Sequence, residues 1–173
     1  NQFFTLPRPK QEALLRSFYD FSKDTKHFLE TQFLGDTEAG ESFIRKMEKE
    51  TTGKIYRRGA PALISGRAVN AIISRAKKTG VNVQTLMKLE QLAYEGFIEF
   101  LHEFGGGPDS YDTMACNHLE TYLRLVKAKI PDTIQRNDVY ETVKRYLLKK
   151  NNMLTDGIDE TFELVTGIKM DRG

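Results

Sequence analysis

Apolar residues recur at helical spacing along most of the chain, and this periodicity constrains the fold more than any other feature. Between about residues 82 and 104 they follow mostly at steps of three and four, as Leu86, Leu89, Ala93, Phe97, Phe100, Leu101 and Phe104. Such steps place side chains on one face of a helix, whereas a strand alternates at steps of two. No clean alternation lasts beyond a few residues. The sequence therefore predicts an all-α protein.

Glycine and proline residues divide this pattern into separate helices. The run from Gly105 to Pro108 is the clearest break, and Gly35, Gly80 and Pro131 mark others. These breaks predict an irregular bundle of about seven helices, near residues 9–34 (with an interruption at Ser22), 37–52, 67–79, 82–104, 109–129, 137–150 and 155–165.

Length and composition favour a single cytoplasmic domain. The 173 residues suffice for one core, so we expect one domain over 1–173, with 1–8 an extended N-terminal segment and 167–173 a C-terminal tail. The single cysteine, Cys116, excludes an internal disulfide and a cysteine-based zinc site. The first residues lack the pattern of a signal peptide, and no apolar run approaches membrane-spanning length.

Charge is distributed unevenly along the chain. The net charge is only +2, but residues 41–80 carry ten basic and three acidic side chains, a net +7. Residues 81–120 carry one basic and seven acidic side chains, a net −6. A strongly basic quarter is thus followed at once by an acidic one, which favours an acidic binding partner for the first of them.

The basic quarter contains a segment, 53–80, with seven cations and no acidic residue. A glycine- and proline-broken loop comes first, and an amphipathic helix follows. The helix places Arg67, Arg75 and Lys78 on one strip of its polar face. We predict that this segment binds an acidic partner, either nucleic acid or an acidic protein. The candidate binding residues are Lys54, Tyr56, Arg57, Arg58, Arg67, Arg75, Lys77 and Lys78.

An internal explanation of the same cations competes with this prediction. Glu95, Glu99 and Glu103 follow at steps of four on the next helix, and a hairpin turning at Gly80 could bring Arg67 to Glu95. Exposed pairs of this kind contribute only about 0–1 kcal/mol each, but they would neutralise the field that a ligand needs. A merely solvated basic face is the third alternative.

Other chemistries have weaker support in the sequence. Glu99 and His102 form a single Glu-x-x-His step, which a di-iron bundle would use twice, so a metal-dependent enzyme that adds His118 is a remote alternative. Cys116 and His118 are two apart on a helix and should point in different directions. No nucleophile elbow, phosphate loop or zinc-protease motif occurs. We therefore expect a non-enzymatic protein without catalytic residues, a metal or a cofactor.

A structural or adaptor protein that assembles through an apolar helical face, as a homodimer, is the other alternative. The eleven phenylalanines do not discriminate between these functions, because their spacing is typical of a core rather than of a base-stacking surface.

The pattern in the second half of the chain resembles a known protein family. It rests on residues 94–105 (YEGFIEFLHEFG), 111–114 (YDTM) and 119–122 (LETY), and on the basic stretch from Arg57 to Ala68. In these residues the chain resembles a functionally uncharacterised family of small all-helical bacterial proteins, over roughly residues 54–166. The resemblance implies a soluble helical domain and assigns no catalytic residue.

Overall fold

The computed structural model describes residues 2–23, 25–26, 28–29, 37–52, 56–57, 60–150 and 155–171. Within these residues there are seven α-helices: α1 (Arg8–Phe21), α3 (Thr37–Thr51), α4 (Gly66–Thr79), α5 (Val83–Phe104), α6 (Ser110–Lys129), α7 (Thr133–Leu148) and α8 (Thr155–Thr166). A 3-10 helix, η1 (Gln2–Thr5), precedes them. Two short strands, β1 (Tyr56–Arg57) and β2 (Ala60–Pro61), pair antiparallel between α3 and α4. The predicted all-α fold of about seven helices is confirmed.

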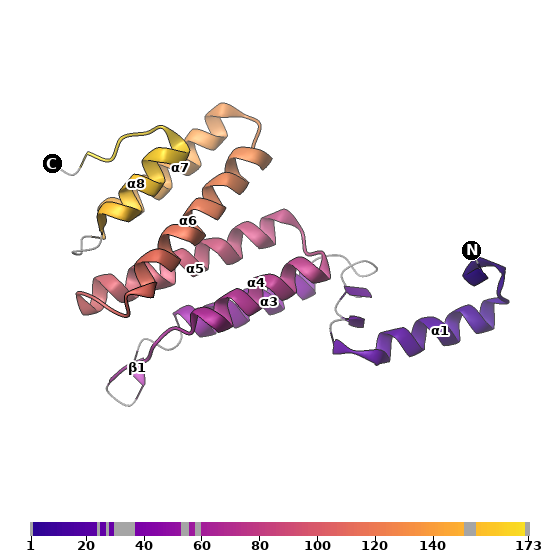
Figure 1. The fold of residues 1–173 in the computed structure, drawn as a ribbon. Coiled ribbons are helices and arrows are strands. Elements are labelled where there is room, and N and C mark those ends of the chain that lie inside the picture. The colour runs from indigo at the N-terminus through magenta and orange to yellow at the C-terminus, as the bar shows by residue number, and fades with distance from the viewer. Residues whose placement is uncertain are drawn as a thin grey trace.

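Helix α5 lies at the centre of the bundle. It packs against α3 and α4 on one side and against α6 on the other, and α8 in turn packs on α6 (Figure 1). Helix α7 contacts α6 and α8. None of the helices in the described part of the chain combines the length and apolarity needed to cross a lipid bilayer.

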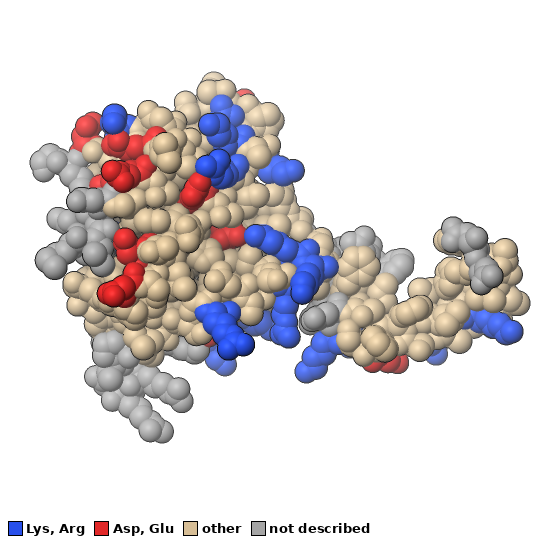
Figure 2. All heavy atoms as spheres, in the orientation of Figure 1, with Lys and Arg blue, Asp and Glu red and all other residues tan. Residues whose placement is uncertain are grey.

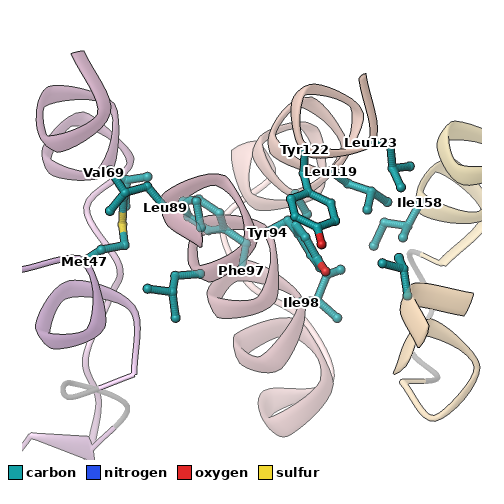
Figure 3. Close-up of a cluster of buried hydrophobic side chains, with 14 of the residues drawn as sticks. Met47, Val69, Leu89, Tyr94, Phe97, Ile98, Leu119, Tyr122, Leu123 and Ile158 are labelled. Atoms are coloured by element: carbon teal, nitrogen blue, oxygen red, sulfur yellow. The ribbon is translucent and has the colours of Figure 1, made fainter. Parts of the chain in front are cut away.

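The core follows from this central position of α5. Leu89, Phe97 and Leu101, on the predicted apolar row, have no exposed surface, and Tyr94 and Ile98 on other sides of the helix are buried too. Figure 3 shows Leu89, Tyr94, Phe97 and Ile98 between Met47 and Val69 on one side and Leu119, Leu123 and Ile158 on the other. Each large apolar side chain buried in this way stabilises the fold by about 1.5–3 kcal/mol.

Most of the helix ends lie where the sequence predicts them. The Asn82 side chain accepts a hydrogen bond from Thr85 N at 2.8 Å and caps α5. Gly80 and Gly105 end α4 and α5 with φ of 73° and 67°, a left-handed conformation that glycine adopts without a steric penalty. The predicted start of α7 at 137 is wrong, because Asp132 caps Gln135 N at 2.9 Å and opens the helix earlier.

The N-terminal segment also differs from the expectation of an extended chain over 1–8. Residues 2–5 form η1, and the Gln11 amide holds this turn by donating to the carbonyl oxygens of Phe3 and Leu6 at 3.2 and 2.9 Å. The predicted interruption at Ser22 is confirmed, since the backbone there is extended and ends α1. The predicted cap at Gly35 lies outside the described residues.

Helix α1 contributes no buried residue, although its apolar spacing predicts an interior face. Its large apolar side chains are 40–81% exposed, namely Leu14, Leu15, Phe18 and Phe21. Figure 1 shows α1 lying to one side of the other helices. The expectation that the phenylalanines fill the core is therefore wrong for this helix, although it holds for Phe43, Phe97, Phe100 and Phe162.

We expect Gly96→Ala to destabilise the fold. A Cβ at Gly96 would lie 2.5 Å from Thr51 Cβ, where α5 crosses α3. Overpacking of this kind costs about 1–3 kcal/mol, against a gain of about 1 kcal/mol from removing a helical glycine. Thermal unfolding should show a net loss, with Tm falling by about 2–4 °C for each kcal/mol lost. The matched control is Gly106→Ala, because nothing lies within 4 Å of that position. An unchanged or raised Tm for Gly96→Ala would contradict the expectation that overpacking against Thr51 outweighs the gain in helix propensity.

Candidate functional site

The helix that carries the predicted binding residues is α4, and its local sequence explains its bounds. Ser65 Oγ accepts a hydrogen bond from Ala68 N at 3.2 Å and caps the N-terminus. Val69, Ile73 and Ala76 are buried against the bundle. The polar residues between them are therefore turned toward solvent, as the sequence predicts.

The predicted binding residues before α4 are only partly described. Tyr56 and Arg57 form β1, whose backbone pairs with β2. Lys54 and Arg58 lie outside the described residues.

The predicted cations of α4 all lie on its accessible surface. Arg67, Arg75, Lys77 and Lys78 are exposed. No ion pair joins Arg67 or Lys78 to a carboxylate in the part of the chain that the structure describes. Figure 2 shows basic side chains gathered over the C-terminal end of α4 and acidic ones toward the end of the molecule where α5 stops.

The competing explanation, in which Arg67 meets Glu95, is not supported, since no ion pair joins these two residues. Glu95 instead accepts a hydrogen bond from Gln91 Nε2 at 2.8 Å. Glu99 pairs with Lys150 Nζ at 2.7 Å and accepts from the Tyr146 hydroxyl at 3.1 Å, so it faces α7. The residue of α5 that forms an ion pair with α4 is Glu90, which pairs with Lys77. Glu90 lies about 140° around the helix axis from Glu95.

A cleft of about 840 Å³ lies beside α4. Helices α4 and α6 form its walls, and Glu90 of α5 is part of its floor. Polar and apolar surface contribute almost equally to its lining, and the hydroxyl, amide and amino groups come from Asn70, Ser74, Lys77, Lys78, Ser110, Thr113, Asn117 and Thr121, with His118, Ile73 and Met114 beside them. This composition suits a polar ligand.

Helices α4 and α6 lie close together at one end of the cleft, its closed end. There the Tyr111 hydroxyl donates to the Ile64 carbonyl oxygen at 2.8 Å, and Gly66 lies directly against the Met114 side chain. From there the two helices diverge toward their C-terminal ends (Figure 1). The other end of the cleft is therefore its open end, where the two walls are bridged through Glu90.

A buried carboxylate joins three helices at the open end. Glu90 is only 2% exposed. Its Oε2 lies 2.7 Å from Nδ1 of His118, and its Oε1 lies 3.4 Å from Nζ of Lys77. Because a carboxylate only accepts, Nδ1 of His118 is the donor of this hydrogen bond. The Phe97 ring stacks on the imidazole at 6.1 Å between centroids and 9° between planes.

The metal alternative has no supporting cluster. No group of three or more histidine, cysteine or acidic side chains close enough to hold an ion occurs among the described residues. Glu99, the expected ligand, is held by Tyr146 and Lys150 as described above.

Cys116 and His118 point in different directions, as the sequence predicts. Burial raises the pKa of the Cys116 thiol, which lies near Thr161 of α8. His118 instead faces α5. A thiol held protonated and away from the imidazole is not an activated nucleophile.

The sequence reasoning overlooked Glu90 and the polar walls. Glu90 lies four residues after Leu86 and seven before Phe97, so it falls on the apolar row of α5. A carboxylate at such a position signals a buried charge that needs partners. Ser110, Thr113, Asn117 and Thr121 recur at helical spacing on α6, which is the sequence signal of a polar wall.

The fold and site define an all-α bundle with a basic helix beside a polar cleft. Comparison with known proteins finds no family model, no curated protein and no solved structure that matches the chain.

The half-buried Glu95 gives a pH-dependent prediction. It lines a smaller cavity of about 270 Å³ with Tyr94, Tyr122 and Tyr146. Burial raises the pKa of the Glu95 carboxyl, against a smaller opposing effect of the Gln91 hydrogen bond. A raised pKa means that the folded chain binds this proton more tightly, so stability is lost as the pH rises from the unfolded-state value through the folded-state value.

We therefore expect Glu95→Gln to stabilise the protein at pH 7, with the gain disappearing in acid, where Glu95 itself is protonated. A glutamine oxygen can still accept the bond from Gln91. Urea denaturation of both proteins at several pH values measures the difference. Glu48→Gln, at an exposed position of α3, is the matched control. A loss of stability in Glu95→Gln at pH 7 would contradict the expectation.

Proposed function

We propose that the protein is a non-enzymatic helical binding module that binds an acidic partner through the α4 basic surface, defined as Arg67, Arg75, Lys77 and Lys78. The preceding candidates, Lys54, Tyr56, Arg57 and Arg58, would extend this surface. The partner is nucleic acid or an acidic protein. We place the module in the cytoplasm, in keeping with its single cysteine.

One observation supports this proposal above the others. Arg67 and Lys78 are exposed, and no described carboxylate pairs with them. The carboxylates of the next helix have other partners, since Glu95 is bonded to Gln91 and Glu99 to Lys150. The cations of α4 span eleven positions, or about 16 Å along the helix. Several phosphates of a nucleic acid lie within that length, since duplex DNA carries one charge per about 1.7 Å.

A salt series tests nucleic acid against protein as the partner. Four cations in contact with phosphates give a log–log slope of about −3.6 on duplex DNA, and each lost contact reduces the slope by about 1. We therefore expect Arg67→Gln with Arg75→Gln to weaken binding in an electrophoretic shift and to flatten the slope by about two.

The control for this series is Lys127→Gln with Lys129→Gln, which removes two exposed cations from α6. Absent or salt-insensitive DNA and RNA binding rejects nucleic acid. In that case an acidic protein is supported if the protein binds polyglutamate and Arg67→Gln with Arg75→Gln weakens this binding. If the protein binds neither nucleic acid nor polyglutamate, the proposal is rejected.

The exposed face of α1 favours a second candidate function, self-assembly. Leu14, Phe18 and Phe21 follow at steps of four and three, the spacing by which helices pair in a coiled coil. Phe21 is 81% exposed and Phe18 55%, and the described core contains no residue of α1. We propose that α1 of a second copy of the chain covers this exposed face, because it presents the same apolar stripe with steps of four and three.

Disrupting this stripe should abolish association. We expect light scattering to report a dimer for the unchanged protein and a monomer for Phe18→Glu with Phe21→Glu. The remaining bundle should keep its circular dichroism spectrum, because neither side chain is buried. The control, Arg16→Gln with Asp20→Asn, changes the opposite face of α1 and should stay dimeric. A strict monomer in the unchanged protein rejects this candidate.

A further inference from the structure

The open end of the cleft is electrostatically suited to an anion. Lys77 and Lys78 lie there, opposed by the single carboxylate of Glu90. Both oxygens of Glu90 already have partners, Lys77 on Oε1 and His118 on Oε2. An incoming anion would therefore meet two ammonium groups and no uncommitted carboxylate oxygen from Glu90.

The imidazole of His118 adds a donor from the opposite wall. The residue is 8% exposed and lines the cleft. Its Nδ1 is engaged by Glu90, whereas no hydrogen bond joins its Nε2 to another described residue. Among the described residues, the buried polar atoms that lack a hydrogen-bond partner do not include Nε2, so this atom reaches solvent. It is thus an accessible nitrogen in an otherwise buried side chain, and an imidazole that carries a hydrogen on both nitrogens can donate from Nε2 to an anion while Nδ1 stays bonded to Glu90.

The length of the cleft indicates a ligand larger than a simple ion. From Ser110 to Thr121 the α6 wall extends for about 16 Å, at 1.5 Å per residue. The volume of about 840 Å³ falls in the range of small-molecule sites. Asn70, Ser110 and Thr113 supply neutral donors and acceptors toward the closed end.

We propose that this cleft binds a phosphomonoester, with its phosphate at Lys77, Lys78 and Nε2 of His118 and its polar remainder toward Asn70 and Thr113. Three donors on two walls match the three terminal oxygens of a phosphate better than the two of a carboxylate. An apolar ligand would leave the hydroxyl and amide groups of the walls unpaired. A phosphomonoester has two sources, which are a free nucleotide or sugar phosphate and the 5′-phosphate end of a nucleic acid. The site shares Lys77 and Lys78 with the α4 basic surface, but it does not rest on that surface binding a partner, because Arg67 and Arg75 do not line the cleft.

Calorimetry with defined probes tests the site. We expect inorganic phosphate and adenosine 5′-monophosphate to bind and adenosine to show no binding. A 5′-phosphorylated oligonucleotide that competes with the monophosphate, where its 5′-hydroxyl counterpart does not, assigns the nucleic-acid end as the source. The absence of that competition assigns the free small molecule.

Variants then locate the binding. Lys78→Gln should weaken monophosphate binding by about tenfold or more, since it removes one charge-assisted contact. Ser74→Leu, which fills the cleft without changing charge, should weaken it as well. Lys127→Gln on the outer side of α6 is the charge-matched control and should leave it unchanged. If His118→Gln folds, its monophosphate binding tests the contribution of the imidazole. If it does not fold, Lys78→Gln and Ser74→Leu decide whether the cleft is the binding site.

Two results overturn the proposal. One is that neither inorganic phosphate nor the monophosphate binds, or that adenosine binds equally well. The other is that Lys78→Gln and Ser74→Leu bind the monophosphate as the unchanged protein does. Arg67→Gln with Arg75→Gln separates this site from the proposed function, because that variant should weaken polyanion binding and leave binding of the monophosphate unchanged.

Discussion

The contacts of the buried Glu90 carboxylate with Lys77 and His118 are the constraint on which the rest of the site depends. Helix α5 is enclosed by α3, α4 and α6, so a carboxylate on its apolar row is taken out of water. An unpaired buried charge costs several kcal/mol, and removing one partner from a buried pair costs about 3–5 kcal/mol. Lys77 and His118 must therefore approach Glu90 from α4 and α6, which fixes how far those helices diverge.

The fold was largely predictable because its signals are local. Helical spacing identifies the helices, and Gly80, Asn82 and Gly105 end or begin them through their own backbone or side-chain chemistry. The start of α7 was missed because the apolar spacing begins after Asp132, which caps the helix. The exposure of α1 could not be predicted, since spacing reveals an apolar face but not whether another element covers it.

The candidate site was predictable only in part, because it depends on the rotation of helices about their axes. The polar face of α4 follows from its own sequence, and its exposed cations lie there as expected. Which residue of α5 meets it depends on tertiary packing, so the choice of Glu95 was wrong and Glu90 went unnoticed. His118 was correctly expected to point away from Cys116, but its partner lies on another helix.

The separation of charge between α4 and the far end of the bundle has a consequence for encounters in solution. Basic groups gather at the C-terminal end of α4 and acidic ones where α5 stops (Figure 2). On this face the described charges are thus separated along the molecule, although its net charge is only +2. The field of a polyanion exerts a torque on charges separated in this way before any contact forms, and that torque turns the C-terminal end of α4 toward the polyanion.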